Sequence, residues 1–222
     1  MDNKNFHDNT VPAQNQLNGK SAVTVGGEGG AVRVLFLGNS ITRHGIAPHL
    51  GWNRECGMAA SSIEKDYVHL TVSALEKRFG KVEFCIAQIS AWEGDLENET
   101  LLAERFSNAR DFGADIVIVR VGENIKTYDN ETLADRFESM TRFFAVKEGC
   151  RVIMTDLFWR KTDIDNAIVE AAARVGATLV SIGDLGMIDE MKALGEYEHR
   201  GVALHPSDRG MAAIADRILE AV

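Results

Sequence analysis

Three polar residues in this sequence have the side chains that acyl transfer needs. Ser40 follows the apolar run VRVLFL in the segment GNS, Asn124 lies in the segment GEN, and His205 precedes Pro206. A serine hydroxyl is a weak nucleophile at neutral pH, so it needs a base such as imidazole within hydrogen-bond distance. An amide side chain can stabilise the oxyanion that forms on attack. We therefore ask whether one fold brings the three together.

Short apolar runs alternate with longer amphipathic segments from residue 31 onward. The runs are apolar enough to be covered on both faces, which is typical of parallel strands. The predicted strands are Val32–Leu37, Val82–Ala87, Ile116–Val121, Arg151–Thr155 and Thr178–Ile182. The predicted helices are Ser61–Phe79, Asn98–Phe112, Glu131–Lys147, Asp163–Val175 and 207–221, the first of them with a capping box from Ser61 and Glu64.

This alternation predicts a three-layer α/β/α, flavodoxin-like sandwich with a five-stranded parallel sheet. Residues 31–222 form the predicted domain, and residues 1–30, rich in Asn, Gln and Gly, form a loosely attached arm. Within that arm, the stretch 23–25 could pair as a short edge strand. Because ligands bind outside the carboxyl ends of such strands, the residues after each strand are the candidates for a site.

Those residues resemble the motifs of the SGNH, or GDSL-type, hydrolases. Gly38-Asn39-Ser40 resembles the GDS block, with Asn in place of Asp; 122–124 resembles the GxND block, and His205-Pro206 the DxxHP block. The resemblance covers roughly residues 31–222. It implies a carboxylic ester hydrolase that works through an acyl-enzyme, with Ser40 as nucleophile, His205 as general base, and no cofactor or metal.

The resemblance also implies an oxyanion hole. Its donors are the backbone N–H of Ser40, the side-chain amide of Asn124, and the backbone N–H of a small residue after the second strand. Ala91 is favoured for this third donor by position, and Gly94 is the alternative.

One position departs from the family pattern. The Asp expected three residues before the histidine is Val202, which cannot orient or stabilise an imidazolium. Three replacements stay open: Glu198 from the preceding loop, Asp208 from the start of the last helix, or a backbone carbonyl that holds His205 in a Ser-His dyad. We favour the dyad and keep Glu198 as the candidate acid.

The three tryptophans all lie in segments that follow a predicted strand. Flat amphipathic rings beside a site can stack on sugar rings, so an acyl ester, most plausibly an acetyl ester, on a carbohydrate is the expected substrate. The alternative is that these rings brace the loops. The residues expected to contact substrate are Asn39, Trp52, Trp92, Glu123 and Trp159.

The overall composition narrows the possible partners. A formal net charge of -9 and a pI near 5.2 disfavour nucleic acid and anionic membranes, which attract basic proteins. Three widely spaced cysteines and the lack of a long apolar segment favour a cytoplasmic protein, although a secreted chain without its leader would look the same. The histidines show no metal-like spacing, and the oligomeric state stays open.

Two other classes of function are compatible with the sequence. A flavodoxin-like module could use residues 38–42 as a nest for phosphate or flavin. A non-catalytic glycan-binding relative is the second alternative, since the missing Asp could mean that activity has been lost.

Overall fold

A six-stranded sheet forms the centre of the computed structural model, which describes residues 22–222. The strands lie in the order β1-β3-β2-β4-β5-β6, and all neighbours are parallel except β1 and β3. Their bounds are Val23–Gly26 (β1), Val32–Gly38 (β2), Val82–Gln88 (β3), Ile116–Arg120 (β4), Arg151–Thr155 (β5) and Thr178–Val180 (β6). Because β3 and β4 flank β2 on opposite sides, the strand order reverses at β2, where sheets of this kind bind ligands.

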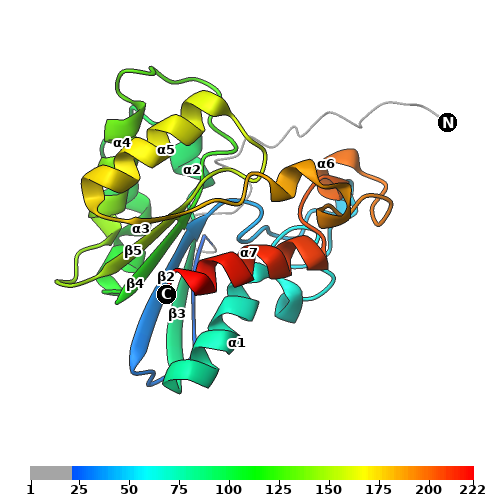
Figure 1. The fold of residues 1–222 in the computed structure, drawn as a ribbon, viewed down its shortest axis with the longest axis horizontal. Helices are drawn as coiled ribbons and strands as arrows, with labels where there is room; N and C mark the ends of the chain where they lie inside the picture. The colour runs from blue at the N-terminus through cyan, green and yellow to red at the C-terminus, as the bar shows by residue number, and fades with distance from the viewer. Residues whose placement is uncertain (1–21) are drawn as a thin grey trace.

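Helices cover both faces of the sheet (Figure 1). The helices α1 and α7 lie on one face, and α3, α4 and α5 lie on the other. Their bounds are Tyr67–Phe79 (α1), Ser90–Gly94 (α2), Leu101–Asp111 (α3), Leu133–Phe144 (α4), Thr162–Val175 (α5), Arg200–Ala203 (α6) and Asp208–Glu220 (α7). Short 3-10 turns occur at Pro48–Leu50 (η2), Ile63–Lys65 (η3), Leu185–Met187 (η4) and Asp189–Met191 (η5). The predicted three-layer α/β fold is confirmed.

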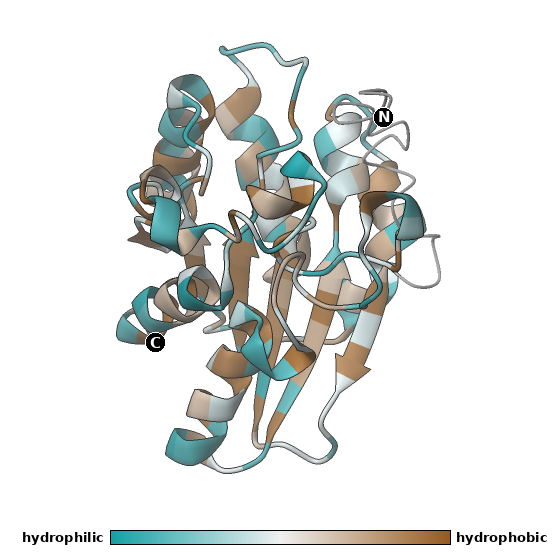
Figure 2. Ribbon diagram, turned by 90° about the vertical axis from the view of Figure 1, so that its right-hand side faces the viewer, coloured by the Kyte–Doolittle hydropathy of each residue, from teal (hydrophilic) through white to brown (hydrophobic). Residues whose placement is uncertain are grey.

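Successive residues of the inner strands contribute to two separate hydrophobic cores. In β2, Leu35 and Leu37 pack under α3, α4 and α5, whereas Val34 and Phe36 pack under α1 and α7. Side chains alternate across a strand, so a strand covered on both faces must be apolar throughout. Figure 2 shows this as strands that are brown along much of their length, between helices that carry teal on their outer surfaces.

Two features differ from the sequence prediction. The sheet has six strands, because β1 pairs antiparallel with β3, as the edge-strand alternative allowed. Residues 1–21 of the predicted arm lie outside the described residues. The first long helix begins at Tyr67 with Asp66 as its cap, and not at Ser61, because the backbone N–H and hydroxyl of Ser61 both donate to the Asp208 carboxylate.

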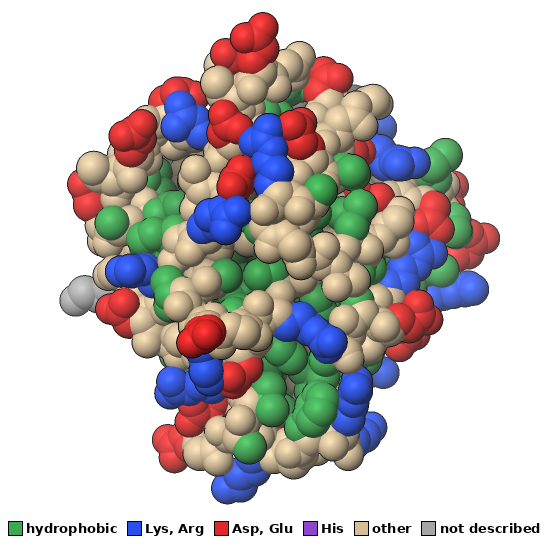
Figure 3. All heavy atoms as spheres, turned by 60° about the vertical axis from the view of Figure 1, so that its left-hand side comes forward, with side chains coloured by type: hydrophobic (Ala, Val, Ile, Leu, Met, Phe, Trp, Pro, Cys, Tyr) green, Lys and Arg blue, Asp and Glu red, His purple; other side chains and the backbone are tan. Residues whose placement is uncertain are grey.

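The surface over α4 and α5 carries interspersed acidic and basic side chains (Figure 3). Arg174 on α5 pairs there with Asp135, Glu138 and Glu170. Within residues 22–222, no helix has both the length and the apolar character that crossing a bilayer requires.

Candidate active site

Ser40 lies in a tight turn at the carboxyl end of the central strand β2. The turn closes because the backbone N–H groups of Thr42 and Arg43 both donate to the Asn39 carbonyl. Thr42 folds back over the end of the strand: a Cβ on Gly38 would lie 1.7 Å from its Oγ1. Only glycine therefore fits before this turn, and the turn delivers Ser40 to the edge of the sheet.

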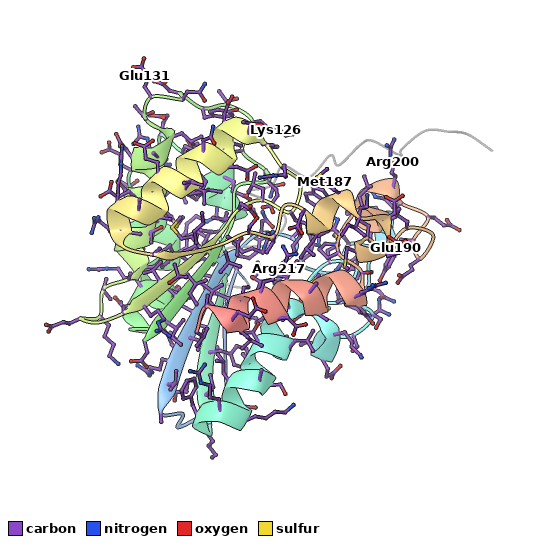
Figure 4. All side chains as sticks on the ribbon, in the orientation of Figure 1. Lys126, Glu131, Met187, Glu190, Arg200 and Arg217 are labelled. Carbon is purple, nitrogen blue, oxygen red and sulfur yellow. The ribbon has the colours of Figure 1, made fainter. Side chains whose placement is uncertain are left out.

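His205 reaches the same edge from the segment between α6 and α7. Arg200, labelled in Figure 4, is the first residue of α6, which is capped by the His199 side chain. The backbone N–H of His205 donates to the Val202 carbonyl, and the His205 carbonyl accepts from Ala193 N–H. These bonds hold the backbone of the histidine in place independently of its contact with the serine.

Ser40 and His205 form a hydrogen-bonded pair. The distance from Ser40 Oγ to His205 Nε2 is 2.8 Å, and His205 Nδ1 lies 2.7 Å from the Gly201 carbonyl oxygen. Since a carbonyl can only accept, Nδ1 must carry the proton, and Nε2 is left as the acceptor for the serine hydroxyl. This is the tautomer that a general base toward Ser40 requires.

The imidazole of His205 is almost completely buried. Desolvation by this burial lowers the pKa of His205 to about 3, and the hydrogen bond to Gly201 opposes that shift only in part. The ring is therefore neutral near pH 7, ready to accept a proton. Its protonated form lacks a carboxylate partner among the described ion pairs.

The structure distinguishes between the three alternatives for the group that orients His205. Glu198 is exposed, and the Nδ1 position that it would have to bind is occupied by the Gly201 carbonyl, so our assignment of Glu198 as the acid is corrected. The Asp208 carboxylate binds Ser61. Val202 is buried in α6. The geometry matches the third alternative, in which a backbone carbonyl orients the histidine.

A cavity of about 310 Å³ opens over the pair. Its apolar wall includes Leu50, Met58 and Leu204, and Trp159 places its ring edge-on to His205 with 4.8 Å between the ring centroids. The indole N–H of Trp159 donates to the Leu204 carbonyl, which fixes that ring. The full lining consists of Ser40, His44, Leu50, Met58, Asn124, Trp159, His199, Gly201, Val202, Leu204 and His205.

Of the three tryptophans, only Trp159 lines this cavity. Trp52 is completely buried in the core beneath α1 and α7, next to Tyr197. Trp92 is buried in the opposite core against Phe137. The prediction that Trp52 and Trp92 contact substrate is therefore corrected: both rings brace the fold.

Behind Ser40 lies a buried polar cluster that we call the charged network. The Arg120 guanidinium binds the Glu123 carboxylate and the Asn39 side-chain oxygen. The Asn39 amide donates to Glu123 Oε2 at 2.6 Å and to Glu93 Oε1 at 2.9 Å. The members of the network are Asn39, Glu93, Arg120, Glu123 and Asn124.

This arrangement corrects two further predictions. Asn39 is completely buried and the Glu123 side chain nearly so, and neither lines the cavity, so neither can contact a substrate held there. Glycine is required between Arg120 and Glu123, since Gly122 has a φ of 137° and a Cβ there would lie 2.8 Å from Leu157. The GEN segment thus turns Glu123 inward and leaves Asn124 half-buried at the cavity.

The remaining oxyanion candidates differ in their position relative to the cavity. Asn124 lines the cavity together with Ser40. Ala91 is buried in the first turn of the short helix α2, which starts beside β2 because Ile89 N–H donates to the Gly38 carbonyl. Ala91 is absent from the cavity lining within the described part of the chain. The donor role of its N–H stays a prediction by resemblance.

Sequence reasoning missed several members of this site. His44 and His199 line the cavity, and the sequence analysis did not assign either of them to the site. Glu93 and Arg120 were not singled out at all. Arg120 gave a signal, because a charged residue in an otherwise apolar strand must find a buried partner, and an acid stands three residues further on.

Comparison with known proteins gives similarity in structure but not in sequence. No protein-family model and no curated protein sequence matches the chain. A solved two-domain esterase active on acetylated mannans, co-crystallised with mannopentaose, superposes with a TM-score of 0.54 at 18% identity. The match covers 85% of this chain and 48% of the esterase, so this chain spans about half the length of the esterase. A protein of Bacteroides uniformis ATCC 8492, provisionally described as a GDSL-like lipase, superposes with a TM-score of 0.52 at 12% identity over 87% of this chain and 96% of that one. At these identities the likeness is one of fold.

Proposed function

We propose that this protein is a serine hydrolase that cleaves carboxylic esters through an acyl-enzyme. Ser40 Oγ attacks the ester carbonyl while His205 Nε2 takes the hydroxyl proton. The bond to the alcohol then breaks, and His205 returns the proton to the leaving oxygen. Water repeats the two steps on the acyl-enzyme, which releases the acid and restores the serine.

The observation that carries the proposal is the Ser40–His205 hydrogen bond of 2.8 Å at the wall of a cavity. Around it, Asn124 and the backbone N–H groups of Ser40 and Ala91 are the proposed oxyanion donors. The Gly201 carbonyl takes the place of the usual acid. It fixes the tautomer of the histidine but, being neutral, it stabilises the imidazolium less than a carboxylate would.

For the substrate, we propose a short acyl ester, most plausibly an acetyl ester, of a carbohydrate. Trp159 offers a ring beside the base, and the cavity of about 310 Å³ suits a small acyl group. The esterase with the same fold acts on acetylated mannans, which is consistent with this class of substrate. Of the three tryptophans, only Trp159 supports a carbohydrate substrate.

The rival binding functions have less support. In the nest predicted at residues 38–42, two N–H groups are already engaged, because Thr42 N–H donates to the Asn39 carbonyl and Ile41 N–H donates to the Asn39 side chain. A non-catalytic glycan-binding relative would not need an oriented Ser-His pair. Labelling of Ser40 by a fluorophosphonate, which requires an activated serine, separates that rival from an esterase.

The direct test is the variant Ser40→Ala. We expect kcat for a small aryl acetate to fall by about a thousandfold or more, with the thermal midpoint little changed. Ser139→Ala, which removes an exposed hydroxyl on α4, is the matched control and should keep full activity. Undiminished hydrolysis by Ser40→Ala would falsify the proposal. A screen of acetylated sugars against longer acyl esters then tests the substrate class.

A further inference from the structure

Glu93 is a buried carboxylate that the proposed reaction does not use. It lies in α2, directly after β3, and is 2% exposed. Four hydrogen bonds converge on it: Oε1 accepts from Gly122 N–H at 2.7 Å, Asn124 N–H at 3.2 Å and Asn39 Nδ2 at 2.9 Å. Its Oε2 accepts from Asn124 Nδ2 at 2.6 Å. Three of the four donors thus belong to the segment that carries the proposed oxyanion donor.

From these contacts we infer that Glu93 is a positioning residue, which orients the Asn124 amide toward the oxyanion. An ionised carboxylate only accepts hydrogen bonds, so Asn124 must turn its NH₂ group, and not its oxygen, toward Glu93. An NH₂ group has two hydrogens. Glu93 binds one, and the other is left for the cavity that Asn124 lines. The inference rests on the proposed function, since it assigns a role within the same reaction.

The backbone around Asn124 is held from both sides, which makes this orientation rigid. Glu93 binds the N–H groups of Gly122 and Asn124, while Lys161 Nζ binds the carbonyls of Glu123 at 2.7 Å and Ile125 at 3.0 Å. A donor that is already in place when the oxyanion forms needs no reorganisation, and this is the source of its stabilising effect.

The rest of the charged network acts on Glu93 in opposing directions. Burial and the nearby Glu123 carboxylate raise the pKa of Glu93, and the hydrogen bonds from Asn124, Asn39 and Gly122 offset that rise only in part. Asn39 gives one hydrogen to each carboxylate, and Arg120 binds Glu123 and the Asn39 oxygen. One guanidinium and five amide-type donors thus surround two buried acids.

A double-mutant cycle tests whether Glu93 acts through Asn124. Glutamine at position 93 carries an NH₂ group of its own, which favours turning the Asn124 oxygen inward. We expect Glu93→Gln to lower kcat for an aryl acetate by about 10- to 100-fold, with KM within about twofold, and Asn124→Ala to lower kcat by about 100-fold. The double variant should be no slower than Asn124→Ala alone. Asp115→Asn, at the opposite end of the sheet, is the control and should keep full activity.

Each outcome of the cycle has a definite meaning. Multiplied losses in the double variant, or unchanged kcat in Glu93→Gln, would overturn the inference while Ser40→Ala stays inactive. Activity that survives in Ser40→Ala would instead remove the proposed function.

Should Glu93→Gln not fold, the side-chain amide of Asn124 can be observed in the wild-type protein by NMR, assigned through its absence in Asn124→Ala. We expect one amide proton shifted strongly downfield by the carboxylate. Two protons with the shifts of a solvated amide would refute the orientation by Glu93.

Discussion

Asn39 and Ser40 are neighbours in the chain, yet the side chain of Ser40 lies in a neutral region and that of Asn39 lies in a charged one. Ser40 joins His205 and a neutral carbonyl beside the cavity. Asn39 joins two carboxylates and a guanidinium in the charged network behind it. Among residues 22–222, no acid is bound at the histidine, but two buried acids lie behind the proposed oxyanion donor Asn124.

This contrast explains why an Asn suits the GNS segment. The Asn39 amide donates one hydrogen to Glu93 and one to Glu123, while its oxygen accepts from Arg120. An Asp at this position could still accept from Arg120, but it would lose both donors and add a third negative charge. Asn39 is therefore matched to its two glutamates, and the variants below test how strongly the two regions depend on that match.

The largest effect is expected from Arg120→Met. Removing the guanidinium leaves Glu123 and Glu93 buried without their cation, which typically costs about 3–5 kcal/mol of unfolding free energy. Urea unfolding measures the loss. Arg174→Met, which breaks ion pairs on the surface, should change stability far less. Equal losses in the two variants would show that the network does not need its cation.

A smaller loss of stability is expected from Asn39→Asp, about 2–3 kcal/mol near pH 8, because two donors are replaced by a like charge. Crowding of three carboxyls favours proton uptake by the folded state. Stability relative to wild type should therefore recover as the pH falls from 8 to 5. If Asn39→Asp is as stable as wild type at pH 8, Asn39 is not matched to its two glutamates.

In the neutral region beside the cavity, His205 should stay unprotonated at pH values far below those at which a histidine usually gains its proton. With its pKa lowered to about 3 by burial, NMR should find the ring neutral at pH 5, where a free imidazole of pKa about 6.5 is mostly charged. Because the unfolded chain binds this proton and the folded one does not, the histidine contributes a loss of stability as the pH drops through 6.5. A titration midpoint near 6.5 would contradict this account.

The smallest effect is expected from Trp159→Phe. Phenylalanine keeps an aromatic ring beside His205 but cannot donate to the Leu204 carbonyl. Losing one hydrogen bond of ordinary strength predicts a reduction of kcat/KM by about fivefold. Steady-state kinetics on an acetylated sugar and on an aryl acetate would show whether the ring serves the sugar. A loss confined to the sugar substrate supports carbohydrate binding, whereas an equal loss on both indicates that Trp159 only steadies His205.

Sequence reasoning succeeded where a residue's surroundings follow from local pattern. The strand Arg151–Thr155 was predicted with its observed bounds, since a run of alternating core contacts leaves a continuous apolar signature. Ser40 and Asn124 each follow a predicted parallel strand, and topology requires the carboxyl ends of such strands to meet at one edge. His205 precedes a helix, and its assignment depended on the resemblance of His205-Pro206 to the DxxHP block.

Other features depend on partners that the pattern does not reveal. No local pattern marks Glu93 and Glu123 as buried acids, and only the three-dimensional fold brings Arg120 and Asn39 between them. The tryptophans misled for the same reason, because proximity to a strand end does not say whether a ring turns to the cavity or to the core. Ser61 met a partner 147 residues away, which no local capping rule anticipates.

The use of a backbone carbonyl at Gly201 affects how mutations can change the site. A catalytic aspartate can be lost by a single missense change, but every amino acid at position 201 supplies a backbone carbonyl. Missense mutations there can weaken the orientation of His205 only through shape; a Cβ at Gly201 would lie 2.9 Å from the His199 ring. The device that fixes the tautomer is thus hard to destroy, and for the same reason it offers selection little means of strengthening the base.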